Sequence, residues 1–204
     1  MHTNASCKIL ITGFSPFPGM RNNPSQWLVQ SIATGVVRLP HDLSVATAIL
    51  PTSWQKVEEL TPDLLTHHQP AIALHFGVHD KTSGFRIEQI ARNRTKQVPD
   101  VDGKLPPCPH IRRDGVRTLR SAVAGEKITV PLRTLGLNAE LSNDAGSYLC
   151  NMLFYLSQLE LRNRKAPGDS LFIHIPPART APARRNLIKG VEVIIRTCAI
   201  NARH

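Results

Sequence analysis

The strongest constraint on the fold is the alternation of short apolar runs with longer amphipathic segments. Strand-type runs cover residues 8–12, 43–50, 71–76, 87–91, 139–142 and 170–175. Helical spacing of apolar residues covers 23–34, 52–65, 130–135, 147–161 and 181–200. This alternation predicts a single α/β domain over residues 1–204, with a mostly parallel twisted sheet and helices on both faces.

Local signals mark some of the element ends. Asn23 precedes a proline at a predicted helix start, where a short polar side chain can cap the helix. Thr52 opens a Thr-Ser-Trp-Gln segment with the spacing of a capping box, so we expect it to cap the next helix. Residues 92–115 are rich in Pro, Gly, Asp and basic residues, which predicts a long loop.

The charge of the chain raises the question of nucleic-acid binding. The formal net charge is +10 and the sequence pI is about 10.0. The basic residues are scattered, however, and the aromatic residues do not interleave with them as a stacking platform requires. We therefore expect a solvated basic surface and do not expect nucleic acid as the main partner.

The cellular compartment of the protein is predicted from patterns that are missing from its sequence. No segment approaches the roughly 20 apolar residues of a membrane span, and the start has no signal-peptide pattern. The four cysteines have no paired spacing, so we do not expect a disulfide framework. They are Cys7, Cys108, Cys150 and Cys198. We expect a cytoplasmic protein without membrane contact.

Active sites of open α/β sheets lie beyond the carboxyl ends of the strands. Cys150 falls in the first turn of the predicted helix 147–161, where the helix dipole favours a reactive thiolate. An isolated cysteine is nevertheless more often a small buried residue. His174 ends the strand 170–175 at the same predicted edge, although a lone strand histidine is also more often a packed residue.

A carboxylate completes this candidate constellation. Glu88, on the strand-like run 87–91, can hold the His174 imidazole in one tautomer, as a nucleophile–base–acid triad requires. Spacing alone equally allows an ion pair of Glu88 with Arg86 or Arg92.

Metal and cofactor patterns are missing from the sequence. Cys108-Pro-His110 lacks zinc-ligand spacing, and the other histidines form no HExxH pattern. The glycines at 13 and 19 do not make a dinucleotide or phosphate-loop fingerprint. We expect no cofactor and no metal.

Four segments together resemble the pyroglutamyl peptidases, also called pyrrolidone-carboxylate peptidases. Residues 10–19, LITGFSPFPG, are similar to that family's TGF-x-PF-x-G signature. Residues 88–93 match E-x-x-A-x-N, and residues 142–151 match S-N-x-A-G-x-x-x-C-N. Residues 172–176 match F-I-H-I-P. The resemblance extends in family order from about residue 8 to residue 198.

The resemblance implies a phosphorylase/hydrolase-like fold and a cysteine peptidase that removes N-terminal pyroglutamyl (5-oxoproline) residues from peptides. It implies a Cys150–His174–Glu88 triad, with Phe14 and Phe17 enclosing the lactam ring of the substrate. The family commonly forms tetramers, so a homotetramer is also implied.

Two segments depart from the family pattern. The family usually has G-Q-A-G-G-R after the third strand, whereas residues 77–84 are GVHDKTSG, with Val78 at a substrate-facing glutamine position. Gln97 stands where the family has an arginine. Two alternatives therefore stay open. One is a related thiol amidase whose altered pocket takes another cyclic or N-acyl group, and the other is a non-catalytic protein that binds through its basic surface.

Overall fold

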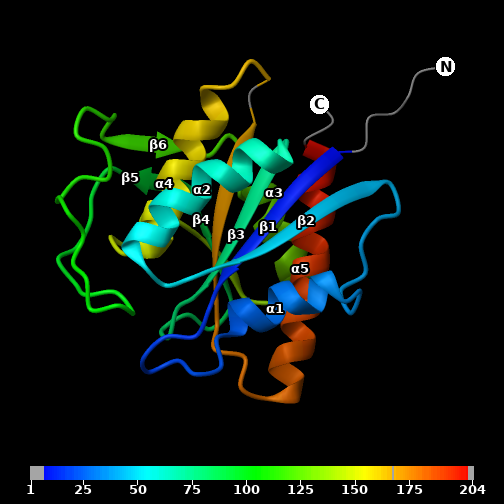
Figure 1. Ribbon diagram of the computed structural model, residues 1–204. Helices are drawn as coiled ribbons and strands as arrows, with labels where there is room; N and C mark the ends of the chain where they lie inside the picture. Colours follow the sequence, from blue (N-terminus) through cyan, green and yellow to red (C-terminus); the bar gives the residue numbers. More distant parts are fainter. Residues whose placement is uncertain (1–6, 167, 202–204) are drawn as a thin grey trace.

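The computed structural model of the chain describes residues 7–166 and 168–201, and its centre is a six-stranded sheet (Figure 1). The strands are ordered β2-β1-β3-β8-β4-β7. Their bounds are β1 Cys7–Phe14, β2 Leu43–Leu50, β3 Ile72–Val78, β4 Phe85–Glu88, β7 Ala139–Ser142 and β8 Asp169–Ile175. A separate two-stranded ribbon pairs β5, Ile90–Arg92, with β6, Thr118–Arg120. The predicted α/β fold with a mostly parallel sheet is confirmed.

The sheet changes direction at one strand. β2, β1, β3 and β8 run parallel, whereas β4 is antiparallel to β8 and parallel to β7. The reason is the link between β3 and β4, residues 79–84, because a link this short cannot hold the crossover helix that parallel strands need. β4 therefore turns back and pairs with β8.

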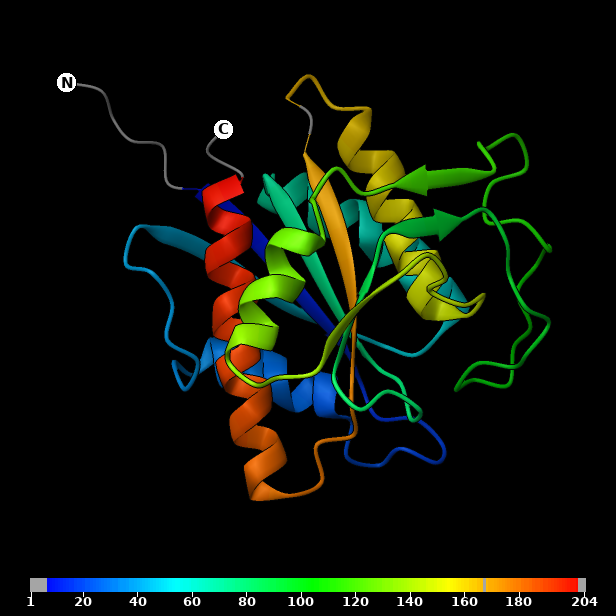
Figure 2. The same ribbon diagram turned by 180° about the vertical axis from the view of Figure 1, so that it is seen from behind.

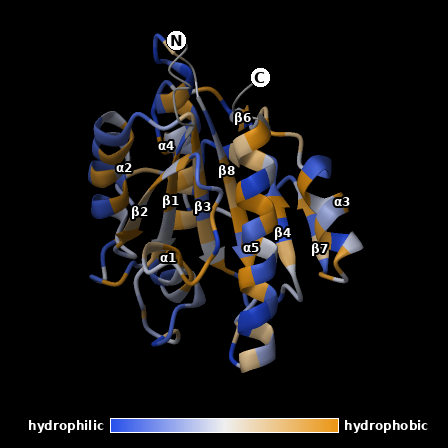
Figure 3. Cartoon of the chain, turned by 90° about the vertical axis from the view of Figure 1, so that its right-hand side faces the viewer, coloured by the Kyte–Doolittle hydropathy of each residue, from blue (hydrophilic) through white to orange (hydrophobic). Residues whose placement is uncertain are grey.

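Five helices cover the two faces of the sheet. α2, Trp54–His68, and α4, Leu149–Arg162, pack on one face. The other face carries α1, Pro24–Ala33, α3, Glu126–Thr134, and α5, Ala181–Asn201, as the view from behind shows (Figure 2). The strands are largely apolar throughout and the helices only on one side, as expected for a sheet buried on both faces (Figure 3).

Side-chain alternation in β8 decides which residues reach which face. Ile173 and Ile175 belong to the core beneath α1, α3 and α5, whereas Phe172 belongs to the core beneath α2 and α4. The two-residue period of a strand therefore places His174 on the α4 side, beside Phe172. A register slip of one residue would reverse this assignment.

The helix starts differ from the expectations in instructive ways. Asn23 caps α1 as predicted, since its Oδ1 accepts the Ser25 N–H at 3.0 Å. The prediction that Thr52 caps α2 is wrong. The backbone N–H of Trp54 donates to Asp100 Oδ2 at 2.9 Å, so the cap comes from the long loop instead. α3 begins earlier than predicted, α4 begins at Leu149 rather than near 147, and β6 was not anticipated.

In the described part of the chain, no helix combines the length and the apolar character that a membrane crossing requires.

We predict that Gly190→Ala destabilises the fold, because a β-carbon at Gly190 would overlap the ring of Phe85 where α5 crosses β4. Overpacking of this kind costs about 1–3 kcal/mol, more than the roughly 1 kcal/mol that alanine contributes in a helix. Urea unfolding measures the change. A Phe85→Leu background should reduce the penalty, and a stabilised Gly190→Ala protein would contradict the prediction.

Candidate active site

The loops that follow β1, β3 and β8 gather at one end of the sheet, the lower end in Figure 1. The register of the paired strands determines which residues lie side by side at this end. Gly77 of β3 lies opposite His174 of β8, and Arg86 of β4 lies opposite His174 from the other side. Glu88 lies opposite Phe172, so its side chain is on the same face as the imidazole. The topology thus brings residues separated by almost one hundred positions to one point.

His174 and Glu88 form a buried hydrogen bond. The imidazole Nδ1 donates to Glu88 Oε1 across 2.8 Å, and the Glu88 side chain is 0% exposed. Arg86 Nε lies 3.2 Å from the same oxygen, while its Nη2 donates to Ser142 Oγ at 2.7 Å. A buried carboxylate needs such cationic partners to offset its lost hydration. Glu88 therefore contacts His174, as the predicted triad requires, and it also contacts Arg86, as the ion-pair alternative allows.

Cys150 is the second residue of α4 and lies against the end of β3. A β-carbon built at Gly77 would stand 3.1 Å from Cys150 Sγ and 2.8 Å from Phe172 Cζ. The missing side chain at Gly77 therefore leaves the space that the sulfur occupies. Because Gly77 is the register partner of His174, this contact also brings the sulfur beside the imidazole.

The electrostatic state of His174 reflects these neighbours. Burial lowers its pKa, but hydrogen bonds to Cys150 and Glu88, together with the negative charges of both groups, outweigh burial and raise the pKa to about 9. The imidazole is thus held as an imidazolium at neutral pH.

The start of α4 is fastened to the long loop by the residue after Cys150. Asn151 is fully buried, and its Oδ1 accepts the Arg92 N–H at 2.9 Å. Its Nδ2 donates to the carbonyls of Arg92 and Arg94 at 2.8 and 3.0 Å. The Lys96 N–H also donates to Ser147 O at 2.7 Å. The loop therefore runs directly along the helix start that carries the sulfur.

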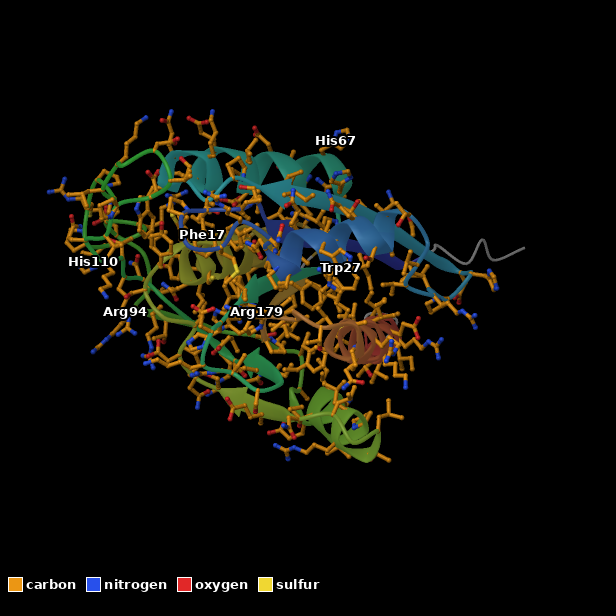
Figure 4. The ribbon with its side chains drawn as sticks, turned by 90° about the horizontal axis from the view of Figure 1, so that it is seen from below. Phe17, Trp27, His67, Arg94, His110 and Arg179 are labelled. Carbon is orange, nitrogen blue, oxygen red and sulfur yellow. The ribbon has the colours of Figure 1, made fainter. Side chains whose placement is uncertain are left out.

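The two predicted ring-binding phenylalanines differ in exposure. Phe14 ends β1 and is only 4% exposed, packed in the core beneath α2 and α4. Phe17 lies beyond the strand in a tight turn closed by the Met20 N–H donating to Phe17 O at 2.8 Å, and it is half-buried. Figure 4, seen from below, shows Phe17 and Arg179 near the middle of this end.

Two further histidines lie near the site. The His79 ring meets the His174 ring edge-on, with centroids 5.3 Å apart. Burial and the charges of His174 and Arg86 lower the pKa of His79, so it is a neutral imidazole beside a charged one. His75 is buried beneath Phe172, bonds to Thr12 Oγ1 at 2.8 Å, and has its pKa lowered by burial to about 3.

The remaining sequence candidates lie around this cluster rather than in it. Val78 ends β3 directly after Gly77, and Gln97 is exposed in the loop beside α4. Cys108 and His110 lie on the distant part of the long loop, with the His110 N–H directed at Cys108 Sγ. Over residues 7–166 and 168–201, no three His, Cys, Asp or Glu side chains are grouped to hold a metal ion.

Sequence reasoning missed three contributors to the geometry. The sequence prediction gives Arg86 only as a competing partner of Glu88, assigns no role to Asn151, and places His79 in the altered segment without its contact with His174. The signal for Asn151 was its place directly after the candidate nucleophile. Arg86 and Glu88 share a face because they are two residues apart on one strand, which the strand period could have indicated.

Comparisons with known proteins agree with this geometry. The family described as pyroglutamyl peptidase matches residues 7–193. The pyrrolidone-carboxylate peptidase of Lactobacillus helveticus is 31% identical over 95% of this chain and 99% of its own length. That of Pyrococcus furiosus is 33% identical over 83% of this chain and 80% of its own length.

Solved structures give the same result. The pyroglutamyl peptidase I of Bacillus amyloliquefaciens superposes with a TM-score of 0.84 at 26% identity, covering 96% of this chain and 98% of that one. The pyrrolidone carboxyl peptidase of Thermococcus litoralis gives a TM-score of 0.86 at 25% identity, covering 97% and 95%. The expected resemblance is confirmed, and the chain belongs to the pyroglutamyl peptidase family.

Proposed function

We propose that this protein is a cysteine peptidase that hydrolyses the amide bond after an N-terminal pyroglutamyl residue. Cys150 is the nucleophile, His174 the general base and acid, and Glu88 the group that orients His174. The observation that carries the proposal is the buried 2.8 Å hydrogen bond between His174 and Glu88, next to the sulfur at the start of α4, in a chain of this family.

The first half of the reaction forms a thioester. The Cys150 thiolate attacks the carbonyl carbon of the pyroglutamyl group, and the carbonyl oxygen takes the negative charge. Tyr148, the N-cap of α4, makes no side-chain capping bond, and we assign the first N–H groups of this helix to stabilise that oxyanion. The His174 imidazolium then gives its proton to the departing peptide amine as the carbon–nitrogen bond breaks.

The second half releases the acid. Neutral His174 takes a proton from water, and the resulting hydroxide attacks the thioester carbonyl. The carbon–sulfur bond breaks, free pyroglutamic acid leaves, and the Cys150 thiolate beside the His174 imidazolium is restored. Glu88 keeps the imidazole Nδ1 protonated in both halves, so Nε2 is the nitrogen that exchanges protons.

The substrate ring is small and uncharged, which suits aromatic walls. We assign the half-buried Phe17 as the accessible aromatic wall of the pocket for this ring. The buried Phe14 packs behind that wall. The neutral His79 also faces this end of the sheet, beside His174.

The segment that holds His79 supports a second candidate, a related thiol amidase acting on a different cyclic or N-acyl group. His79 brings an imidazole to the ring of His174, and Val78 has no amide with which to bind a lactam. Hydrolysis of a panel of N-terminally blocked amides separates the two candidates. The pyroglutamyl amide is expected to give the highest kcat/KM, and a larger value for another acyl group would favour the second candidate.

Location and assembly belong to the same proposal. A catalytic thiol works best where thiols stay reduced, and Cys108 and Cys150 carry free thiols, which supports a cytoplasmic enzyme. Assembly as a homotetramer follows from the family resemblance, and light scattering of the purified protein tests it.

We predict that Cys150→Ser or His174→Ala lowers kcat/KM for a chromogenic pyroglutamyl amide by about a thousandfold or more, because each removes one member of a cooperating pair. Steady-state kinetics measure the loss, and circular dichroism checks the fold. Cys108→Ser, the matched thiol control, should keep full activity. Full activity in either triad variant would rule out the mechanism.

We predict a pH profile with an alkaline limb near pH 9. His174 must be protonated in the resting ion pair, and its pKa is raised to about 9 by Cys150 and Glu88 against the effect of burial. Activity is therefore lost as pH rises through that value. Glu88→Gln removes a negative charge, lowers the pKa of His174 and moves the alkaline limb of kcat/KM to lower pH. An unmoved limb would show that Glu88 does not act on His174.

A further inference from the structure

A cleft of about 450 Å³ lies next to the proposed active site, on the α1 and α5 side of the sheet end. It is bounded by the loop between β1 and α1 and by the loop between β8 and α5. Its lining contains three arginines, Arg21, Arg179 and Arg184, and no acidic side chain. A smaller hollow of about 240 Å³ continues it past Arg21 and Arg184 along the start of α1.

Within residues 7–166 and 168–201, no ion pair is recorded for the three guanidinium groups. In the described part of the chain, every recorded ion pair of an arginine involves another residue, one of Arg86, Arg92, Arg94 and Arg112. Arg184 is held in place, with its guanidinium 5.1 Å from the centre of the Trp27 ring and its Nε directed at Ala178 O. Three positive charges around one cleft create a positive electrostatic potential there, and this potential attracts anions.

Two helix starts add to this field. Pro24, the first residue of α1, lines the cleft, and Arg184 lies in the first turn of α5. The amino end of a helix carries partial positive charge. Both dipoles therefore act in the same direction as the arginines, and the cleft is suited to a carboxylate, which guanidinium groups bind in a bidentate manner.

The loops that line the cleft follow β1 and β8, the strands that end at Phe14 and Ile175. Arg179 follows His174 by five residues, and Arg21 follows Phe17 by four. Figure 4, which looks at this end from below, shows Phe17 and Arg179 there, with Trp27 on α1. An extended peptide advances about 3.3–3.6 Å per residue, so two or three residues extend about 7–11 Å from the pyroglutamyl group. The pyroglutamyl ring is uncharged and does not form an ion pair with an arginine. The peptide that follows the ring can carry a carboxylate that does.

We propose that Arg21, Arg179 and Arg184 form a subsite for a carboxylate of the leaving peptide, in the first few residues after the pyroglutamyl group. The enzyme is thereby selective for acidic peptides. This inference rests on the proposed peptidase function and adds a substrate class to it. The carboxylate comes either from an Asp or Glu side chain or from the free carboxyl terminus of a short peptide.

Three peptides test the subsite: pyroglutamyl-Glu-Ala-Ala amide, the same amide with Gln in place of Glu, and the Gln peptide with a free carboxyl terminus. We expect kcat/KM to be about fivefold or more higher for the Glu amide than for the Gln amide at low salt, as for partly exposed charge pairs. The ratio should shrink in high salt. A gain confined to the third peptide identifies the terminal carboxylate as the ligand.

Variants attribute the preference to the cleft. The double change Arg21→Gln/Arg179→Gln should bring the Glu-to-Gln ratio of kcat/KM close to one. Arg185→Gln, the matched control, removes an exposed arginine of α5 that does not line the cleft, and the ratio should persist. Equal values for all three peptides in the unaltered protein would overturn the inference, as would a preference that survives the double change.

Binding separates this inference from the proposed function. The Kd of each peptide is measured with Cys150→Ser protein, which needs no turnover. Absence of hydrolysis of every pyroglutamyl substrate would contradict the peptidase function, while the Kd ratio still decides the subsite. Tight binding of a single-stranded oligonucleotide that the double change abolishes, with no peptide preference, would overturn the subsite in favour of a nucleic-acid surface.

Discussion

The buried hydrogen bond between His174 and Glu88 is the interaction on which the rest of the site depends. A carboxylate with no exposed surface is stable there only because the imidazolium and Arg86 surround it. In return, the sulfur and the carboxylate raise the pKa of His174 to about 9 against the effect of burial. Glu88 therefore contacts both His174 and Arg86, and His174 contacts both Glu88 and Cys150.

Strand direction makes this cluster possible. Because β4 turns back against β8, Arg86 and Glu88 reach the imidazole from one side, while parallel β3 presents Gly77 from the other. Features on both faces of the sheet meet at this end. The sulfur arrives from α4 on one face, and the arginine-lined cleft opens beside α1 and α5 on the other. A substrate that crosses the sheet end contacts both.

The sequence predicted the fold class, most elements and the residues that meet at the site, because these depend on apolar period and on strand ends. It did not predict that Asp100 caps α2, since a carboxylate 46 positions away leaves no local pattern. The contact of His79 with His174 was equally hidden, because it depends on how residues 79–84 turn back. The difference in burial between Phe14 and Phe17 required the packing of α2 and α4 around β1.

Asn151 has a mechanical consequence. Its three hydrogen bonds join the helix that carries Cys150 to the neighbouring loop. Neither can swing aside to admit a peptide without leaving a fully buried amide unsatisfied. The turn around Phe17 and the loop of residues 79–84, which carries His79, take no part in these hydrogen bonds, so a movement of either leaves the Asn151 amide satisfied.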